Sequence, residues 1–115
     1  IFVHVDEIIE WCSKLNLRMC LDISHTHLTC TNFSLDFYEF IKKIAPFTAH
    51  IHYGDAKGVN GEGLQIGQGD IDFIKLGKIL NKGCPNASFI PEIWQGHKNG
   101  GEGFWIALDK LENTL

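Results

Sequence analysis

Three short apolar runs, separated from one another by helical patterns, constrain the fold of this chain more than any other feature. The runs cover residues 18–23, 48–53 and 88–93 and are rich in the β-branched and aromatic residues of buried strands. Strands buried on both faces are typical of parallel sheets, in which crossover helices connect consecutive strands. The alternation therefore predicts an α/β fold built from consecutive β/α units.

Four stretches carry apolar residues at intervals of three and four, the spacing of an amphipathic helix. We expect Asp6 to cap the first helix, and Ser34 or Asp36 the second, because their side chains accept hydrogen bonds from free helix amides. The segments between the helices and strands are predicted to be loops, and a long loop in a compact domain is usually functional. The helices are expected at residues 5–16, 35–45, 70–81 and about 103–113, and the main loops at 26–34, 54–69 and 94–103.

Three β/α units with helices at both ends do not close into a structure by themselves. They match the last three units of a parallel (β/α)8 TIM barrel, which usually needs about 250 residues. The chain has 115 residues and opens Ile-Phe-Val without an initiator Met. We therefore expect residues 1–115 to be the C-terminal part of a single TIM-barrel domain, represented by three strands and four helices. Such an open piece is expected to associate, for example as a homo-oligomer.

The net charge, the apolar runs and the cysteines of the sequence indicate which partners and which cellular compartment to expect. Ten basic and fourteen acidic side chains give a net charge of −4, which makes nucleic acid an improbable partner. No apolar run approaches the roughly 20 residues that span a bilayer, so no membrane partner is expected. Four cysteines occur without a Cys-x-x-Cys pair, which favours reduced thiols in a cytoplasmic protein over disulfides or a cysteine zinc site.

Each apolar run ends close to a potential metal ligand. Asp22, His52 and Glu92 are 30 and 40 residues apart, about one β/α unit each. The carboxyl ends of barrel strands share one rim, so the three side chains are expected to meet there. One imidazole and two carboxylates suit a divalent cation such as Mn²⁺, Zn²⁺, Co²⁺, Fe²⁺ or Mg²⁺. The alternatives are hydrogen-bonded histidines for His50 and His52, and capping or salt-bridged side chains for each ligand taken alone.

These residues resemble the motifs of a known superfamily. Asp22-Ile-Ser-His25 resembles an Asp-x-x-His motif, His52-Tyr-Gly-Asp55 a His-x-x-Asp motif, and Glu92 the last-strand Glu of the xylose isomerase-like TIM barrels. That superfamily contains sugar and sugar-phosphate isomerases and epimerases together with endonuclease IV. The resemblance covers the whole chain as strands six to eight. It implies that Asp22, His52 and Glu92 are metal ligands, with a fourth ligand, a Glu closing strand five, expected just before Ile1.

The isomerase branch implies proton transfer through a metal-stabilised enediolate, with Glu92 as one of two catalytic carboxylates. His25 resembles a substrate-contacting histidine, or a second-metal ligand in the nuclease branch. Lys57 would neutralise a substrate oxygen or phosphate, with a solvated loop lysine as the alternative. The substrate partner implied is a small sugar or sugar phosphate. We expect activity in a full-length protein and an incomplete site in the 115-residue chain.

Two loops add further candidates. Residues 61–69 resemble the family's Gly-x-Gly loop, but Gly61-Glu62-Gly63 stands where endonuclease IV carries a metal-binding Asp-x-His. This difference disfavours a nuclease and leaves Glu62 as a substrate contact or as part of a structural turn. In the last loop, His97 and Lys98 suggest a phosphate site, which the nearby acidic Glu102 opposes.

Three functions therefore remain open. The first is a metal-dependent sugar or sugar-phosphate isomerase or epimerase. The second is an endonuclease IV-like phosphodiesterase of AP endonuclease family 2. The third is an accessory barrel module of a cell-surface sugar biosynthesis protein of the sialic-acid type.

Overall fold

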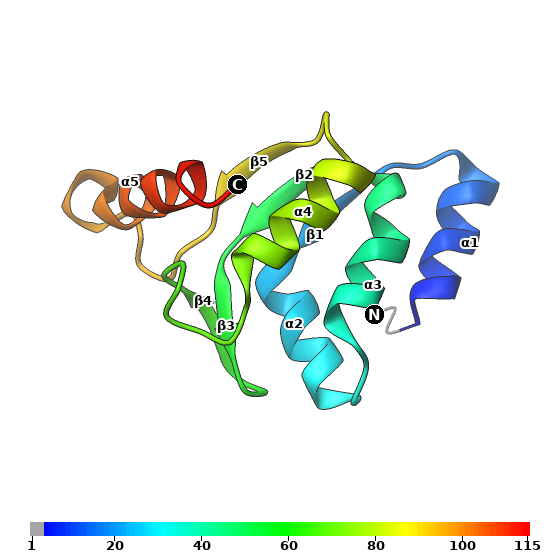
Figure 1. Cartoon of the computed structure of the whole chain (residues 1–115), viewed down its shortest axis with the longest axis horizontal. Coiled ribbons are helices and arrows are strands. Elements are labelled where there is room, and N and C mark those ends of the chain that lie inside the picture. Colours follow the sequence, from blue (N-terminus) through cyan, green and yellow to red (C-terminus); the bar gives the residue numbers. More distant parts are fainter. Residues whose placement is uncertain (1–3) are drawn as a thin grey trace.

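A three-stranded parallel sheet forms the centre of the computed structural model, which describes residues 4–115 (Figure 1). Its strands are β1 (Met19–Asp22), β2 (Thr48–Tyr53) and β5 (Ser88–Pro91), in the order β1-β2-β5. Helices separate these strands in the sequence, and both pairings are parallel. The predicted α/β fold with a parallel sheet is confirmed. In the described residues the sheet stays open, and the closed barrel is not formed.

Residues 4–115 form five α-helices and one short 3-10 helix, where four helices were expected. Within residues 4–115, no helix is both long enough and apolar enough to cross a membrane. The helices are α1 (Val5–Leu15), α2 (Ile23–Asn32), α3 (Phe37–Ile44), η1 (Ala45–Phe47), α4 (Phe73–Gly83) and α5 (Lys98–Glu112).

One face of the sheet carries the hydrophobic core. Ile51 and Tyr53 of β2 point into it and are almost fully buried. Helices α3 and α4 contribute Ile41, Ile44 and Leu76 to the same cluster, and all three side chains have no exposed surface. At roughly 2 kcal/mol for each fully buried aliphatic side chain, this packing is the main term that holds the helices on the sheet.

The opposite face of the sheet carries polar side chains. As predicted from the two-residue period of a strand, His50 and His52 share this face, with ring centroids 5.3 Å apart. The parallel register aligns Cys20 with His50 and Asp22 with His52. All four side chains are at least partly accessible to solvent. The functional groups therefore lie on the side of the sheet away from the core.

The segment 26–34, predicted to be a loop, instead belongs largely to helix α2. Asp22 caps this helix, because its side chain accepts a hydrogen bond from the backbone N–H of His25 at 2.9 Å. Ile23 and Cys30 anchor the helix by burial. Its other residues are mostly threonine, histidine and asparagine, which give no apolar periodicity. The prediction is wrong because tertiary burial of two side chains outweighs weak local propensity.

The long loop 54–69 also contains regular structure. Strands β3 (Asp55–Lys57) and β4 (Gly61–Leu64) form an antiparallel hairpin there. In Figure 1 the hairpin extends from the carboxyl end of β2. Its glycines make the segment resemble a loop, yet Gly58 serves the hairpin turn with a φ of 60°.

Helix boundaries differ from the predictions by a few residues. Asp36 caps α3, as expected. Asp72 caps α4 through the N–H groups of Ile74 and Lys75, so this helix begins later than predicted. Position 4, not Asp6, is the cap of α1. Helix α5 is interrupted by left-handed backbone at residues 99–101, so its regular part begins near the expected position.

Candidate metal centre

The three predicted ligands meet at the carboxyl end of the sheet. Asp22 is the last residue of β1, His52 is its register partner on β2, and Glu92 directly follows β5. One ligand atom from each residue lies within 4.8 Å of the other two. Because three parallel strands end at the same rim, residues far apart in the sequence come within coordination reach of one point.

Two of the ligands already contact each other. Nδ1 of His52 lies 2.8 Å from Oε2 of Glu92. A neutral imidazole keeps one ring nitrogen with a free lone pair, and such a nitrogen can bind a cation. Two carboxylates and one such imidazole form a donor set that fits a divalent cation of intermediate hardness.

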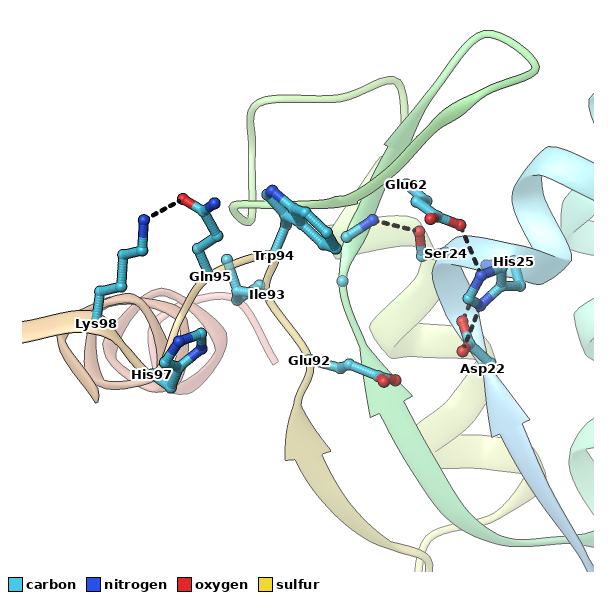
Figure 2. A pocket seen from close by; sticks show the side chains of 12 residues that line it. Asp22, Ser24, His25, Glu62, Glu92, Ile93, Trp94, Gln95, His97 and Lys98 are labelled. Atoms are coloured by element: carbon cyan, nitrogen blue, oxygen red, sulfur yellow. Dashed lines mark hydrogen bonds and ion pairs between the residues drawn. The ribbon is translucent and has the colours of Figure 1, made fainter. Parts of the chain in front are cut away.

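A cleft of about 560 Å³ opens beside the ligands (Figure 2). Figure 2 shows the carboxylate of Glu92 directed towards Asp22 and His25, with the indole ring of Trp94 above it. Trp94 is 73% exposed, so its indole ring is available to a ligand in the cleft. The cleft is lined by Asp22, Ser24, His25, Gly54, Glu62, Gly63, Glu92, Ile93, Trp94, Gln95, His97 and Lys98.

A row of three side chains crosses one wall of this cleft. Nδ1 of His25 lies 2.6 Å from Oδ2 of Asp22, and its Nε2 lies 2.8 Å from Oε2 of Glu62. The hydrogen bond to Asp22 raises the pKa of His25; burial opposes this shift and Glu62 reinforces it. The imidazole therefore stands between two carboxylates and carries positive charge more readily than an isolated histidine.

Backbone hydrogen bonds fix the hairpin against the rest of this wall. Ser24 is only 4% exposed, and its hydroxyl donates to the carbonyl of Asp55 and accepts from the N–H of Gly63. The carbonyl of Gly63 in turn accepts from the N–H of Trp94 at 2.7 Å. Gly63 has a φ of 62°, a conformation that a side chain would strain. One glycine thus connects α2 with the segment that follows β5.

Asp55 has a structural role in the arrangement. Its side chain is completely buried and accepts four backbone hydrogen bonds. Such a carboxylate is tolerated in a core only when its oxygens are satisfied in this way. The four bonds hold the end of the hairpin loop against β3, which makes Asp55 a support for the cleft wall. The donors are the N–H groups of Ala56, Gly67, Gly69 and Ile71.

The remaining predicted contacts fall at different places. His25, Glu62 and His97 line the cleft with the ligands. His97 comes from the other end of the cleft, where the amino group of Lys98 bonds to Gln95 at 3.0 Å (Figure 2). Lys57 is exposed on the hairpin and does not line the cleft. A role for Lys57 in substrate binding would therefore require a substrate that extends out of the cleft.

Comparison with known proteins agrees with this geometry. The sequence model of one family, described as xylose isomerase-like TIM barrel, matches residues 2–112. The chain belongs to this family. The predicted resemblance to the xylose isomerase-like superfamily is thereby confirmed. No curated protein matches the chain.

Two residues of this xylose isomerase-like site are not evident from the sequence. Ser24 stands in the sequence only as a spacer within the Asp22-to-His25 motif, yet its hydroxyl connects two walls of the cleft. Asp55 is the last residue of the His52-to-Asp55 motif, and the sequence alone gives it no role. The sequence does offer a signal for Asp55, because glycines stand 12 and 14 residues later, at Gly67 and Gly69. A glycine lets its backbone N–H come close to a carboxylate, and both N–H groups donate to Asp55. No local signal exists for Ser24.

Proposed function

We propose that this chain is part of a metal-dependent sugar or sugar-phosphate isomerase or epimerase. One observation carries the proposal: Asp22, His52 and Glu92 offer donor atoms within 4.8 Å of one another beside a cleft of small-molecule size. The family of the chain supports it, since xylose isomerase-like barrels include such enzymes. In this proposal β1, β2 and β5 are strands six, seven and eight of a barrel.

The metal would be held by Asp22, His52 and Glu92. The mixed oxygen and nitrogen donors suit Mn²⁺, Zn²⁺, Co²⁺ or Mg²⁺. When bound, a divalent cation would supply the positive charge that lowers the cost of removing a proton beside a substrate carbonyl.

The side chains of the cleft would divide the remaining work. Glu92, with a side chain 56% exposed, can take a proton from a substrate carbon and return it. His25 can donate a hydrogen bond to a substrate oxygen, and its raised pKa favours the donating form. Trp94 can cover one face of a sugar. His97 and Lys98 would face the far end of the substrate, where a phosphate would be attached.

Solvent hydrogen exchange tests the proposal whichever sugar is the product. The chain, and any longer protein that contains it, is incubated in D₂O with aldoses, ketoses and their phosphates and with each cation in turn. Deuterium at the carbon beside the carbonyl, detected by NMR, is the expected result, and it should disappear in His52→Ala. Cleavage of abasic DNA without such exchange would point to the nuclease. If neither activity is found, the accessory module remains as the function.

The proposed setting is the cytoplasm. All four cysteines of the chain are free thiols in the structure. Free thiols persist in a reducing compartment. Titration of four free thiols in denatured protein purified without reductant would agree with this setting. A mass two or four hydrogens below that of the fully reduced chain, as one or two disulfides would give, would contradict it. The proposed partners are a small sugar or sugar phosphate and a second copy of the chain, with no membrane and no nucleic acid.

A further inference from the structure

We propose that Glu62 is a positioning residue that holds the metal ligand Asp22 in place through His25. This inference rests on the proposed metal site, but it assigns Glu62 a task different from substrate contact. Glu62 lies on β4 of the hairpin, 40 residues away from Asp22 in the sequence. Its influence on the metal would pass through one imidazole ring.

The carboxylate of Asp22 is held by His25. His25 occupies both oxygens of this carboxylate, through its backbone N–H at 2.9 Å from Oδ1 and its Nδ1 at 2.6 Å from Oδ2. The orientation of the Asp22 carboxylate is therefore set by the position of His25. Each oxygen retains a second lone pair for a cation.

The His25 ring is itself held by two carboxylates. Its side chain is 61% exposed, so packing alone does not fix it. Its two polar contacts are Asp22 at one nitrogen and Glu62 at the other. Figure 2 shows the ring standing between these two carboxylates. Without Glu62, rotation of the ring would be restrained at one nitrogen only.

The backbone next to Glu62 is held by hydrogen bonds of the following residue. Its neighbour Gly63 donates to the buried hydroxyl of Ser24 at 2.9 Å and accepts from the N–H of Trp94 at 2.7 Å. These two bonds fix the peptide units on either side of Gly63, the residue that follows Glu62. A side chain with a fixed base and a charged hydrogen bond at its tip is suited to orient the ring that contacts the metal ligand. Residues that contact a metal ligand directly, as His25 contacts Asp22, are typically worth roughly 10- to 100-fold in metal affinity.

Metal affinity separates this role from direct substrate contact. We would titrate the 115-residue chain with Zn²⁺ and with Mn²⁺ by calorimetry. In Glu62→Ala the His25 ring loses its second contact, and the dissociation constant is expected to rise about tenfold. Glu62→Gln keeps an acceptor oxygen at the same distance and should restore most of the affinity. Glu102→Ala removes an exposed carboxylate outside the cleft lining and should change nothing.

The rescue by glutamine decides the outcome. Equal weakening in Glu62→Ala and Glu62→Gln would show that only charge matters, and it would overturn the positioning role. Unchanged affinity in both variants, or no metal binding by the unmodified chain, would also overturn it. Melting temperatures of the variants are measured in parallel, and because Glu62 is half exposed they are expected to stay unchanged.

The outcome for this inference is independent of the outcome for the proposed reaction. Weaker metal binding in Glu62→Ala, restored in Glu62→Gln, together with no deuterium exchange into any sugar, would reject the isomerase and keep the positioning role. Ser24→Ala provides a second variant. It frees the N–H of Gly63, and it should weaken metal binding in the same direction as Glu62→Ala.

Discussion

The imidazole of His52 and the carboxylate of Glu92 are in contact, with Nδ1 2.8 Å from Oε2, although 40 residues separate them in the sequence. One side chain belongs to a central strand and the other to the segment just beyond an edge strand. This contact places a candidate base and a candidate nitrogen ligand at a single point of the rim. It makes Glu92 the residue whose replacement is most informative.

Glu92→Gln is expected to lose the proposed proton transfer and to weaken metal binding at least about tenfold, because the amide offers one neutral oxygen in place of a carboxylate. The fold should be retained, since the side chain is 56% exposed. Deuterium exchange and Zn²⁺ calorimetry measure the two effects. Glu112→Gln, at the end of α5, is the matched control. A Glu92→Gln chain with full exchange activity would refute the catalytic role.

Asp55→Ala is expected to lower the free energy of unfolding by about 3 kcal/mol or more, because four backbone N–H groups lose their acceptor. Urea denaturation measures this loss. Asp6→Ala is the control, since Asp6 is highly exposed and its removal should cost no more than about 0.5 kcal/mol. Similar losses in the two variants would mean that the buried carboxylate is not the support of the hairpin loop.

Alkaline pH is expected to destabilise the chain through its buried thiols. Burial raises the pKa of Cys30 to about 11, with a smaller contribution from the charge of Asp36. The folded state therefore favours the neutral thiol. This contribution is complete below the ordinary thiol pKa and is lost as the pH rises towards 11. The free energy of unfolding, followed by urea denaturation from pH 8 to pH 11, should fall less steeply in Cys30→Ala. Identical slopes would contradict the assignment.

The face formed by β5 and α5 is expected to promote association. Trp105 is 69% exposed and lines an apolar groove together with Ile90, which is 45% exposed. Light scattering after gel filtration should show a mass that increases with concentration, and Trp105→Gln should reduce this increase. Trp11→Gln alters an exposed tryptophan on α1 and serves as the control. A monomer at all concentrations would refute the expectation.

The parts of the fold with strong local patterns could be predicted from the sequence. The strand around Ile51 combines apolar content with a two-residue period, and α3 combines Asp36 as a cap with a regular apolar face. Helix α2 could not be found, because Ile23 and Cys30 are buried by contacts distant in the sequence. Local propensity for threonine and histidine gives no indication of such burial.

For the candidate site, the convergence of the three candidate ligands was predictable and their supports were not. Asp22, His52 and Glu92 each follow from one rule, that parallel strands end at a shared rim. The contact between His25 and Glu62 depends on a hairpin that the sequence presents as a glycine-rich loop. Backbone hydrogen bonds such as those of Gly63 carry no side-chain signature, so they become visible only in three dimensions.

The peptide units on both sides of Gly63 join three stretches of the chain: the start of α2, the hairpin and the segment behind β5. The protection of the Gly63 amide against solvent exchange therefore reports the contact of the hairpin with α2. The protection of the Trp94 amide reports the contact of the hairpin with the segment behind β5. Two NMR resonances can then report whether the cleft is assembled, before any ligand is known.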